Sequence, residues 1–199
     1  KIPGKDYSIG KTEVTQKLYE SIMGENPSEF KGKDNPVENV SFIDAIYFCN
    51  KLSMMYGFEC AYAFDNEPDI NEWNYTPNKG EKPYYKAFQC SKDANGFRLP
   101  TPEEWRYAAK GGQDFKYAGS DNIDEVGWTS SNSKNTTHPV ATKKVNGYGL
   151  YDMQGNVSEW CLEPKGISLG GLNWSNEQRS VNNIGQYNII GFRLVRNVD

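Results

Sequence analysis

A run without secondary-structure periodicity near the C-terminus limits what this chain can fold into. The segment from Gly170 to Leu194 begins with Gly-Gly-Leu-Asn-Trp and closes with Ile-Gly-Phe-Arg-Leu. Its middle, residues 175–189, shows neither a helical repeat nor strand-like alternation, is rich in Asn and contains no cysteine. A polar, aperiodic middle between such ends indicates a surface that a scaffold displays, rather than a regular element of a core.

Length and composition fit one domain, residues 1–199, with a sizeable core. Aromatic residues make up 14 % of the chain, so we expect aromatic clusters to hold a loop-rich fold. The net charge of -4, with scattered basic residues, argues against a nucleic-acid surface, which needs clustered Lys and Arg. No apolar run approaches the length of a membrane span, and no signal-peptide pattern is present.

Local signals predict three helices, over residues 16–23, 42–53 and 102–110. Each is preceded by a Ser or Thr able to cap it, and the first and third are followed by Gly. Residues 57–95 are expected to form a hairpin with loops, because a structureless excursion of that length is unusual in a compact domain. Beyond the third helix, turns and short strands predominate up to the C-terminus. Helices followed by short strands indicate the α+β class.

The four cysteines do not form a recognisable metal motif. They are Cys49, Cys60, Cys90 and Cys161. There is no CxxC pair and only one histidine, which excludes an ordinary zinc set. Disulfides are possible but not required, and we expect free, mostly buried thiols. Cys161, directly after Trp160, is interpreted as a small buried apolar residue.

Three polar residues invite a catalytic reading that the sequence does not favour. Glu103 and Glu104 could form an acid/base pair, but carboxylates in the first turn of a helix serve mainly its dipole and cap. His138 has no nucleophile next to it in sequence, so a turn or surface position is expected.

A carboxylate-rich turn is the candidate metal site. Asp152, Gly155, Val157 and Glu159 could wrap a calcium ion with side-chain and backbone oxygens, although the spacing is not that of an EF-hand. The alternative is an Asx-type turn that leads into a core Trp. No cofactor is required by the sequence, and calcium is the one that it allows.

A series of motifs resembles the formylglycine-generating-enzyme, or sulfatase-modifying-factor, domain family. They are residues 13–16 (EVTQ), 23–28 (MGENPS), 36–41 (PVENVS), 97–105 (FRLPTPEEW), 146–153 (NGYGLYDM), 155–160 (GNVSEW) and 191–194 (GFRL). They occur in order over nearly the whole chain. The resemblance implies a C-type-lectin-like α+β fold, with two main helices, small antiparallel sheets, much irregular structure and an exposed C-terminal face.

The enzymes of this family oxidise a substrate cysteine with two cysteines that hold copper after the Gly-Gly motif. Here residues 172–179 contain no cysteine. Soft thiolate ligands are what copper chemistry needs. The resemblance therefore leaves a formylglycine-generating oxidase as the disfavoured alternative, together with an iron enzyme, for which a single histidine is too few.

The chain resembles more closely the variable proteins of diversity-generating retroelements, a second branch of the same fold. In these systems adenines of a template are randomised, so Asn codons are the main substrates, and the C-terminal region, here about 170–194, varies. The resemblance implies the following ligand-contacting residues: Leu172, Asn173, Ser175, Ser180, Asn182, Asn183, Ile184, Gly185, Tyr187, Asn188 and Ile189. The supporting frame would be Trp174, Arg179, Phe192 and Arg193, through aromatic burial and guanidinium hydrogen bonds.

This resemblance implies a non-enzymatic protein that binds a protein or glycan on another cell or surface. It also implies display on the outer cell surface as a lipoprotein. Since the sequence starts at Lys1 rather than Met, the lipid anchor is expected outside this chain. A third reading is a structural or regulatory partner domain that uses its helix side.

Overall fold

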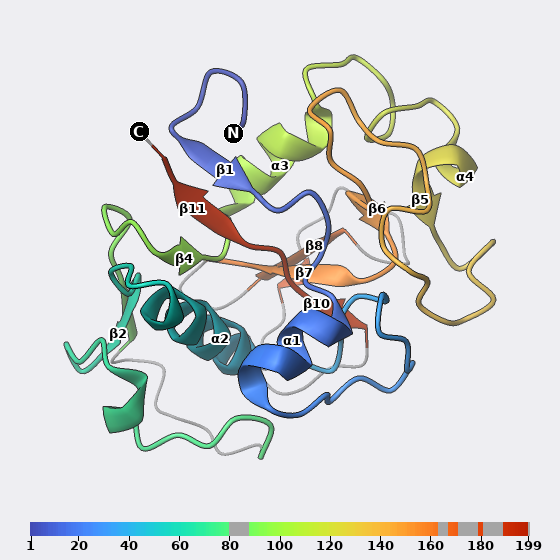
Figure 1. The fold of residues 1–199 in the computed structure, drawn as a ribbon. Coiled ribbons are helices and arrows are strands. Elements are labelled where there is room, and N and C mark those ends of the chain that lie inside the picture. Colours follow the sequence, from blue (N-terminus) through green and yellow to red (C-terminus); the bar gives the residue numbers. More distant parts are fainter. Residues whose placement is uncertain (80–87, 163–166, 171–178, 181–188, 199) are drawn as a thin grey trace.

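Short helices and strands alternate with irregular segments in the computed structural model (Figure 1), which describes residues 1–79, 88–162, 167–170, 179–180 and 189–198. At residues 167, 168, 170, 179 and 180 only the backbone is described. The helices are α1 Gln16–Met23, α2 Phe42–Met55, the 3-10 turn η1 Ile70–Glu72, α3 Pro102–Lys110 and α4 Ile123–Val126. The strands are β1 Tyr7–Ile9, β2 Tyr62–Phe64, β3 Phe88–Cys90, β4 Phe97–Arg98, β5 Gly127–Trp128, β6 Gln154–Gly155, β7 Ser158–Cys161, β8 Ile167–Gly170, β9 Arg179–Ser180, β10 Ile190–Gly191 and β11 Val195–Asn197.

The three expected helices are confirmed, with their caps. The Thr15 side chain accepts a hydrogen bond from an N–H of the first turn of α1, and Gly24 in the left-handed region ends that helix. Capping boxes open both longer helices, at Ser41 for α2 and at Thr101 for α3. In the described residues a fourth helix, α4, also forms; it has four residues, too few to show a helical repeat in sequence.

Glu104 has a structural task at the start of α3. Its carboxylate accepts the backbone N–H of Thr101 at 2.8 Å and binds the Arg98 guanidinium through both oxygens, each at 2.7 Å. Glu103 is exposed and makes neither contact. Both glutamates therefore lie in the first turn of the helix, as expected, and Glu104 is half-buried with its carboxylate bound to Arg98 and to the cap.

Within the described residues, four small sheets join segments that are distant in sequence. The sheet orders are β1-β11-β4, β10-β7-β8-β9, β2-β3 and β5-β6. The β2–β3 hairpin confirms the expected excursion after α2. Two pairings, β10–β7 and β5–β6, are parallel, in contrast to the antiparallel pairs expected. These strands are two to four residues long and are joined by long connections, so the chain can enter a pairing from either direction.

Strand β7 lies between two hydrophobic cores. Trp160 is fully buried in the core that contains α1 and α2, and its ring meets Phe42 edge-to-face at 5.8 Å. Cys161, the next residue, is fully buried in the other core, beside Trp105 and Ala108 of α3. Side chains of successive strand residues point to opposite faces, so this one strand joins both cores.

The chain ends lie side by side (Figure 1), because β1 and β11 pair antiparallel from Tyr7 opposite Asn197 to Ile9 opposite Val195. Within the described ranges, no helix has both the length and the apolar character that crossing a membrane requires.

Candidate ligand-binding site

The first residue of the predicted ligand-binding segment and a residue near its end both pair with Ser158 at the start of β7. Gly170 of β8 pairs with Ser158 antiparallel on one side, and Ile190 of β10 pairs with it parallel on the other. The Ser158 N–H donates to the carbonyl of Ile189 at 2.9 Å. Since neighbouring strands are about 4.8 Å apart, the two ends are roughly 10 Å from each other. Gly170 and Ile190 therefore lie on either side of the same residue of β7, while Arg179–Ser180 between them pairs with the far edge of β8.

The returning end is tightly packed. A Cβ added to Gly191 would lie 2.3 Å from the carbonyl oxygen of Val37, so no larger residue fits there without a shift of the backbone. Phe192 is fully buried, with its ring edge-on to Phe48 at 5.3 Å and to Tyr19 at 6.3 Å. The exit of the segment is thus anchored to α1 and α2.

Arg193 then reaches across to β7. Its Nε and Nη2 donate to the two carboxylate oxygens of Glu159, both at 2.6 Å, and neither side chain is more than 1 % exposed. The guanidinium also donates to the carbonyls of Gly10 and Tyr151, each at 3.2 Å. Trp105 of α3 donates its Nε1–H to Glu159 at 2.8 Å. Five segments of the chain therefore meet at this ion pair.

Two further carboxyl groups lie in the same buried region. Glu13 is 2 % exposed and neither of its oxygens has a hydrogen-bond partner; Oδ1 of Asp152 is also without a partner. Burial, and then the charges of Asp152 and Glu159, raise the pKa of Glu13 well above its ordinary value. Burial also raises the pKa of Asp152. Burial lowers the pKa of Arg193, but the carboxylates, Glu159 first, outweigh this and raise it.

The predicted calcium ligands fall in this region, and three of the four carboxylate oxygens of Asp152 and Glu159 already have protein partners. Both oxygens of Glu159 are bound by Arg193, and Oδ2 of Asp152 accepts the N–H of Ala141 at 2.7 Å. Calcium takes six to eight oxygens at 2.3–2.6 Å, whereas here one unpartnered carboxylate oxygen, Oδ1 of Asp152, is left between these two residues. Gly155 and Val157 are buried, and Gly155 pairs with Trp128. Calcium stays a prediction.

The predicted contact residues are placed only in part. Ile189 is half-buried, and Ser180 is described by its backbone in β9, which pairs with β8. The others lie outside the described residues: Leu172, Asn173, Ser175, Asn182, Asn183, Ile184, Gly185, Tyr187 and Asn188. Of the predicted frame, Phe192 and Arg193 are fully buried, Arg179 is described by its backbone, and Trp174 lies outside the described part.

The four thiols are free and poorly suited to chemistry. Burial raises the pKa of Cys49 and Cys161 well above its ordinary value. Burial also raises the pKa of Cys60, and that of Cys90 to about 11. The thiolate is the form that binds metal or attacks a substrate, and it is disfavoured at all four positions.

His138 packs against an aromatic ring. Its imidazole stacks on Trp128 with ring centroids 3.7 Å apart, and Lys143 Nζ lies 4.0 Å from the centroid of the same ring. The Asn156 side chain makes two hydrogen bonds to the backbone of His138: Oδ1 accepts its N–H, and Nδ2 donates to its carbonyl. His138 lies in an irregular stretch rather than in a turn, and the stacking explains why it is only half-exposed.

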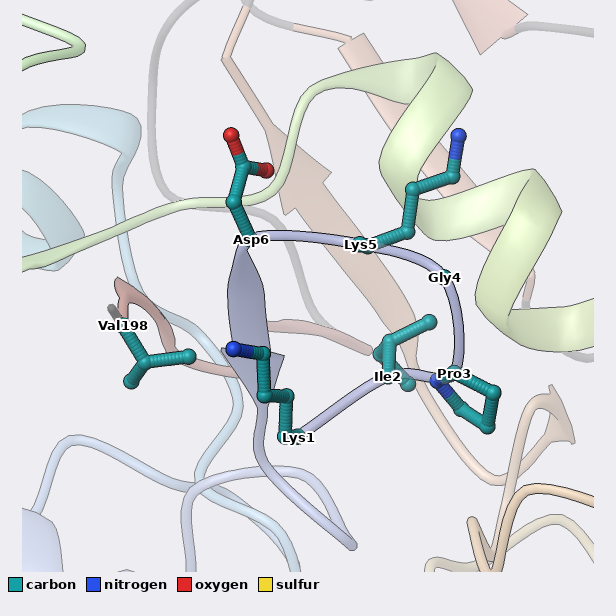
Figure 2. Close-up of a pocket in the computed structure, with 7 residues that line it drawn as sticks. All are labelled: Lys1, Ile2, Pro3, Gly4, Lys5, Asp6 and Val198. Atoms are coloured by element: carbon teal, nitrogen blue, oxygen red, sulfur yellow. The ribbon is translucent and has the colours of Figure 1, made fainter.

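The N-terminal turn forms a depression on the surface (Figure 2). It is lined by Lys1, Ile2, Pro3, Gly4, Lys5, Asp6 and Val198. None of them belongs to the predicted contact set. The Lys5 Nζ lies over the ring of Tyr107, 4.4 Å from its centroid, in a cation–π contact. The depression adds nothing to the site.

Sequence reasoning missed three residues that support the site: Glu13, Trp105 and Ser158. Glu13 and Trp105 lie in motifs that carried only the family resemblance, and nothing in their spacing indicates a shared contact with residues near 159 and 193. Glu13 did carry a local signal: it is a carboxylate within an alternating, strand-like segment, directly before the apolar Val14. Ser158 carries no signal, because strand register depends on partners far along the chain.

Comparisons with known proteins agree with this fold. Treponema denticola variable protein 1 superposes with a TM-score of 0.87 and 33 % identity, over 96 % of this chain and 84 % of that one. Chaperone protein LppX of Paenibacillus barcinonensis is 42 % identical over 187 residues, which is 79 % of this chain. The chain spans 62 % of that relative's length. Formylglycine-generating enzyme of Streptomyces coelicolor is 38 % identical over 83 residues, 34 % of this chain and 26 % of the enzyme.

The family comparison covers almost every residue. Residues 1–198 match the family described as sulfatase-modifying factor enzyme 1-like domain. The match includes the helices, the β7 strand and the buried Arg193–Glu159 pair. The chain is therefore a member of the sulfatase-modifying factor enzyme 1-like domain family.

Proposed function

We propose that this chain is a non-enzymatic binding protein whose segment of residues 170–194 contacts the ligand and is diversified by a retroelement. The observation that carries the proposal is the pairing of both Gly170 and Ile190 with Ser158. Because the two ends are fixed on one buried strand, residues between them can be exchanged without altering the cores. Similarity to a variable protein at 33 % identity over most of both chains supports the same function.

The thiols support recognition rather than oxidation. No cysteine follows the Gly-Gly motif within residues 172–179, and burial raises the pKa of all four thiols elsewhere. Affinity would come from aromatic and adaptable polar contacts, a composition that resembles antibody loops. Asn, Ser and Tyr within residues 175–189 supply such contacts.

The proposed ligand is a protein or glycan on another cell or surface. We propose display on the outer surface of the cell, with a lipid anchor outside this chain. Protease treatment of intact source cells tests the location: cleavage of the protein without lysis supports surface display, and protection until lysis contradicts it.

The contact set is tested by a triple substitution. A ligand selected from protein and glycan arrays with the wild-type chain should be lost when Leu172, Ile184 and Tyr187 are changed to Ala together. The matched control changes Leu18, Met55 and Tyr56 to Ala, three exposed apolar residues on or next to α1 and α2. Loss of binding in the control alone would assign recognition to the helix side instead.

A chimera gives an independent test. Residues 170–196 of a second family member are placed on this chain, and ligand preference is measured for both parents and the chimera. We expect preference to follow the segment. If it stays with the body, the chain acts as a partner domain through its helices, a function that similarity to a protein named as a chaperone favours.

Diversification is tested at the gene. We expect a reverse-transcriptase gene nearby, together with an adenine-rich near-copy of the last hundred or so bases of the coding sequence. Differences between the two copies should coincide with adenines. An isolated gene without a template copy would contradict this part of the proposal.

An oxidase is the second candidate, because formylglycine-generating enzymes match a third of the chain. Incubation with a sulfatase peptide and added copper tests it. Conversion of the peptide cysteine to formylglycine would overturn the non-enzymatic assignment.

A further inference from the structure

The backbone of Ile189 is left-handed, with a φ of 78°. In the described part of the chain the other non-glycine residues with positive φ are Asn39, Asp65, Asn66, Asn74, Asn78, Lys134, Asn135, Ala141, Asp152 and Asn156. Eight of these ten are Asn or Asp, whose short polar side chains tolerate this region. Ile189 is the β-branched exception among these described residues, and β-branched side chains fit the region worst.

The neighbours of Ile189 impose this conformation. Its carbonyl accepts the N–H of Ser158 at 2.9 Å, and Ile190 is held in the parallel pair with the same residue. Gly191 lies against the carbonyl of Val37, and Phe192 is fully buried. The chain cannot slide along β7 to relieve the strain, because each of these contacts would be lost.

We infer that position 189 is a positioning residue that acts through its left-handed backbone and not through side-chain contact with the ligand, and that Ile occupies it under strain. Asn and Gly are the residues that fit this position, and the turn that they stabilise fixes where the segment enters β10. The inference rests on the proposed function in one respect, the assignment of this segment to ligand binding. It removes residue 189 from the contact set and places it with the frame.

Thermal unfolding of four variants tests the inference, with no ligand needed. Ile189→Asn should raise the Tm by about 2–6 °C, since it relieves the strain of the left-handed conformation. Ile189→Gly should also raise it, by less, because glycine gains entropy in the unfolded chain. Ile189→Val should give no gain, and Ile189→Pro should lower the Tm, because proline excludes positive φ.

If the Ile189 side chain is instead retained for packing, the variants should rank in the opposite order of Tm. In that case Asn and Gly would lower the Tm most and Val least, and this result would overturn the inference. Leu194 is the matched control: it is likewise half-buried but is not among the residues with positive φ. Leu194→Asn and Leu194→Gly should both lower the Tm.

Hydrogen exchange at the Ser158 amide reports on the turn itself. Protection should be kept in Ile189→Asn and lost in Ile189→Pro, beyond any change in global stability. Unchanged protection in the proline variant would show that the turn does not need a left-handed residue. If preference in the chimera fails to follow residues 170–196 while these results hold, the proposed function fails and the backbone assignment of residue 189 stands.

Discussion

Arg193 donates two hydrogen bonds of 2.6 Å to the two carboxylate oxygens of Glu159, in a place where both side chains are inaccessible to solvent. Arg193 is the last residue but one of the segment 170–194, and Glu159 follows Ser158, the residue that pairs with both Gly170 and Ile190. The ion pair thus ties the exit of the segment to the strand that supports it. Glu13 and Asp152 lie in the same buried region, and burial raises the pKa of both carboxyl groups.

Arg193→Met should destabilise the fold by about 3–5 kcal/mol, because it leaves Glu159 buried without its partner. Chemical denaturation measures the change. Glu125→Gln is the control: it breaks the exposed pair with Lys144, whose atoms are 3.3 Å apart, and should leave the midpoint almost unchanged. A small effect of Arg193→Met would show that the pair does not support the strand.

Glu13 should make the protein less stable as the pH rises above 4.5. Its pKa is raised above the ordinary 4.5, so the folded state keeps its proton where the unfolded state has lost it. This contribution is fully present below pH 4.5 and is lost as the pH rises through the raised pKa, by at most about 1.4 kcal/mol per pH unit. Denaturation midpoints across pH should fall less in Glu13→Gln than in wild type. An exposed control, Glu20→Gln, should follow wild type; parallel curves for all three would contradict the prediction.

Glu104→Ala should lower the free energy of unfolding much more than Glu103→Ala. The first removes the Glu104 carboxylate from the capping box of α3 and leaves the buried guanidinium of Arg98 without that carboxylate, a loss of about 2–5 kcal/mol. The second removes an exposed side chain and should change stability by no more than about 0.5 kcal/mol. Calorimetry of both variants decides this. Equal effects would mean that Glu104 acts only through the helix dipole.

Chelation should leave the Tm unchanged, because Arg193 already supplies the positive charge at Glu159. Thermal unfolding is measured with EDTA, then with added calcium and, separately, magnesium. A fall with EDTA that calcium alone restores would establish the predicted site at Asp152, Gly155, Val157 and Glu159, and would require Arg193 to share Glu159 with the ion.

The helices were predictable because their signals are local. Thr15, Ser41 and Thr101 are followed within one turn by the groups that they cap, so each start can be found without knowledge of the rest of the chain. Pairing of Ser158 with Gly170 and Ile190 could not be found this way. Strand register depends on which distant residues become neighbours, and two-residue strands carry almost no periodic pattern.

The sequence by itself determined the three capped helices, the family resemblance and the lack of cysteines after the Gly-Gly motif. These depend on residue identity within a few positions, where spacing alone sets geometry. Only the tertiary structure decided that Glu13, Glu159 and Arg193 share one buried region, and that Ile189 turns left-handed beside Ser158. Glu159 and Arg193 are 34 residues apart in sequence, so they become buried and paired only when the chain folds. The free-energy cost of removing these charges from water depends on that burial and pairing, which the local sequence does not contain.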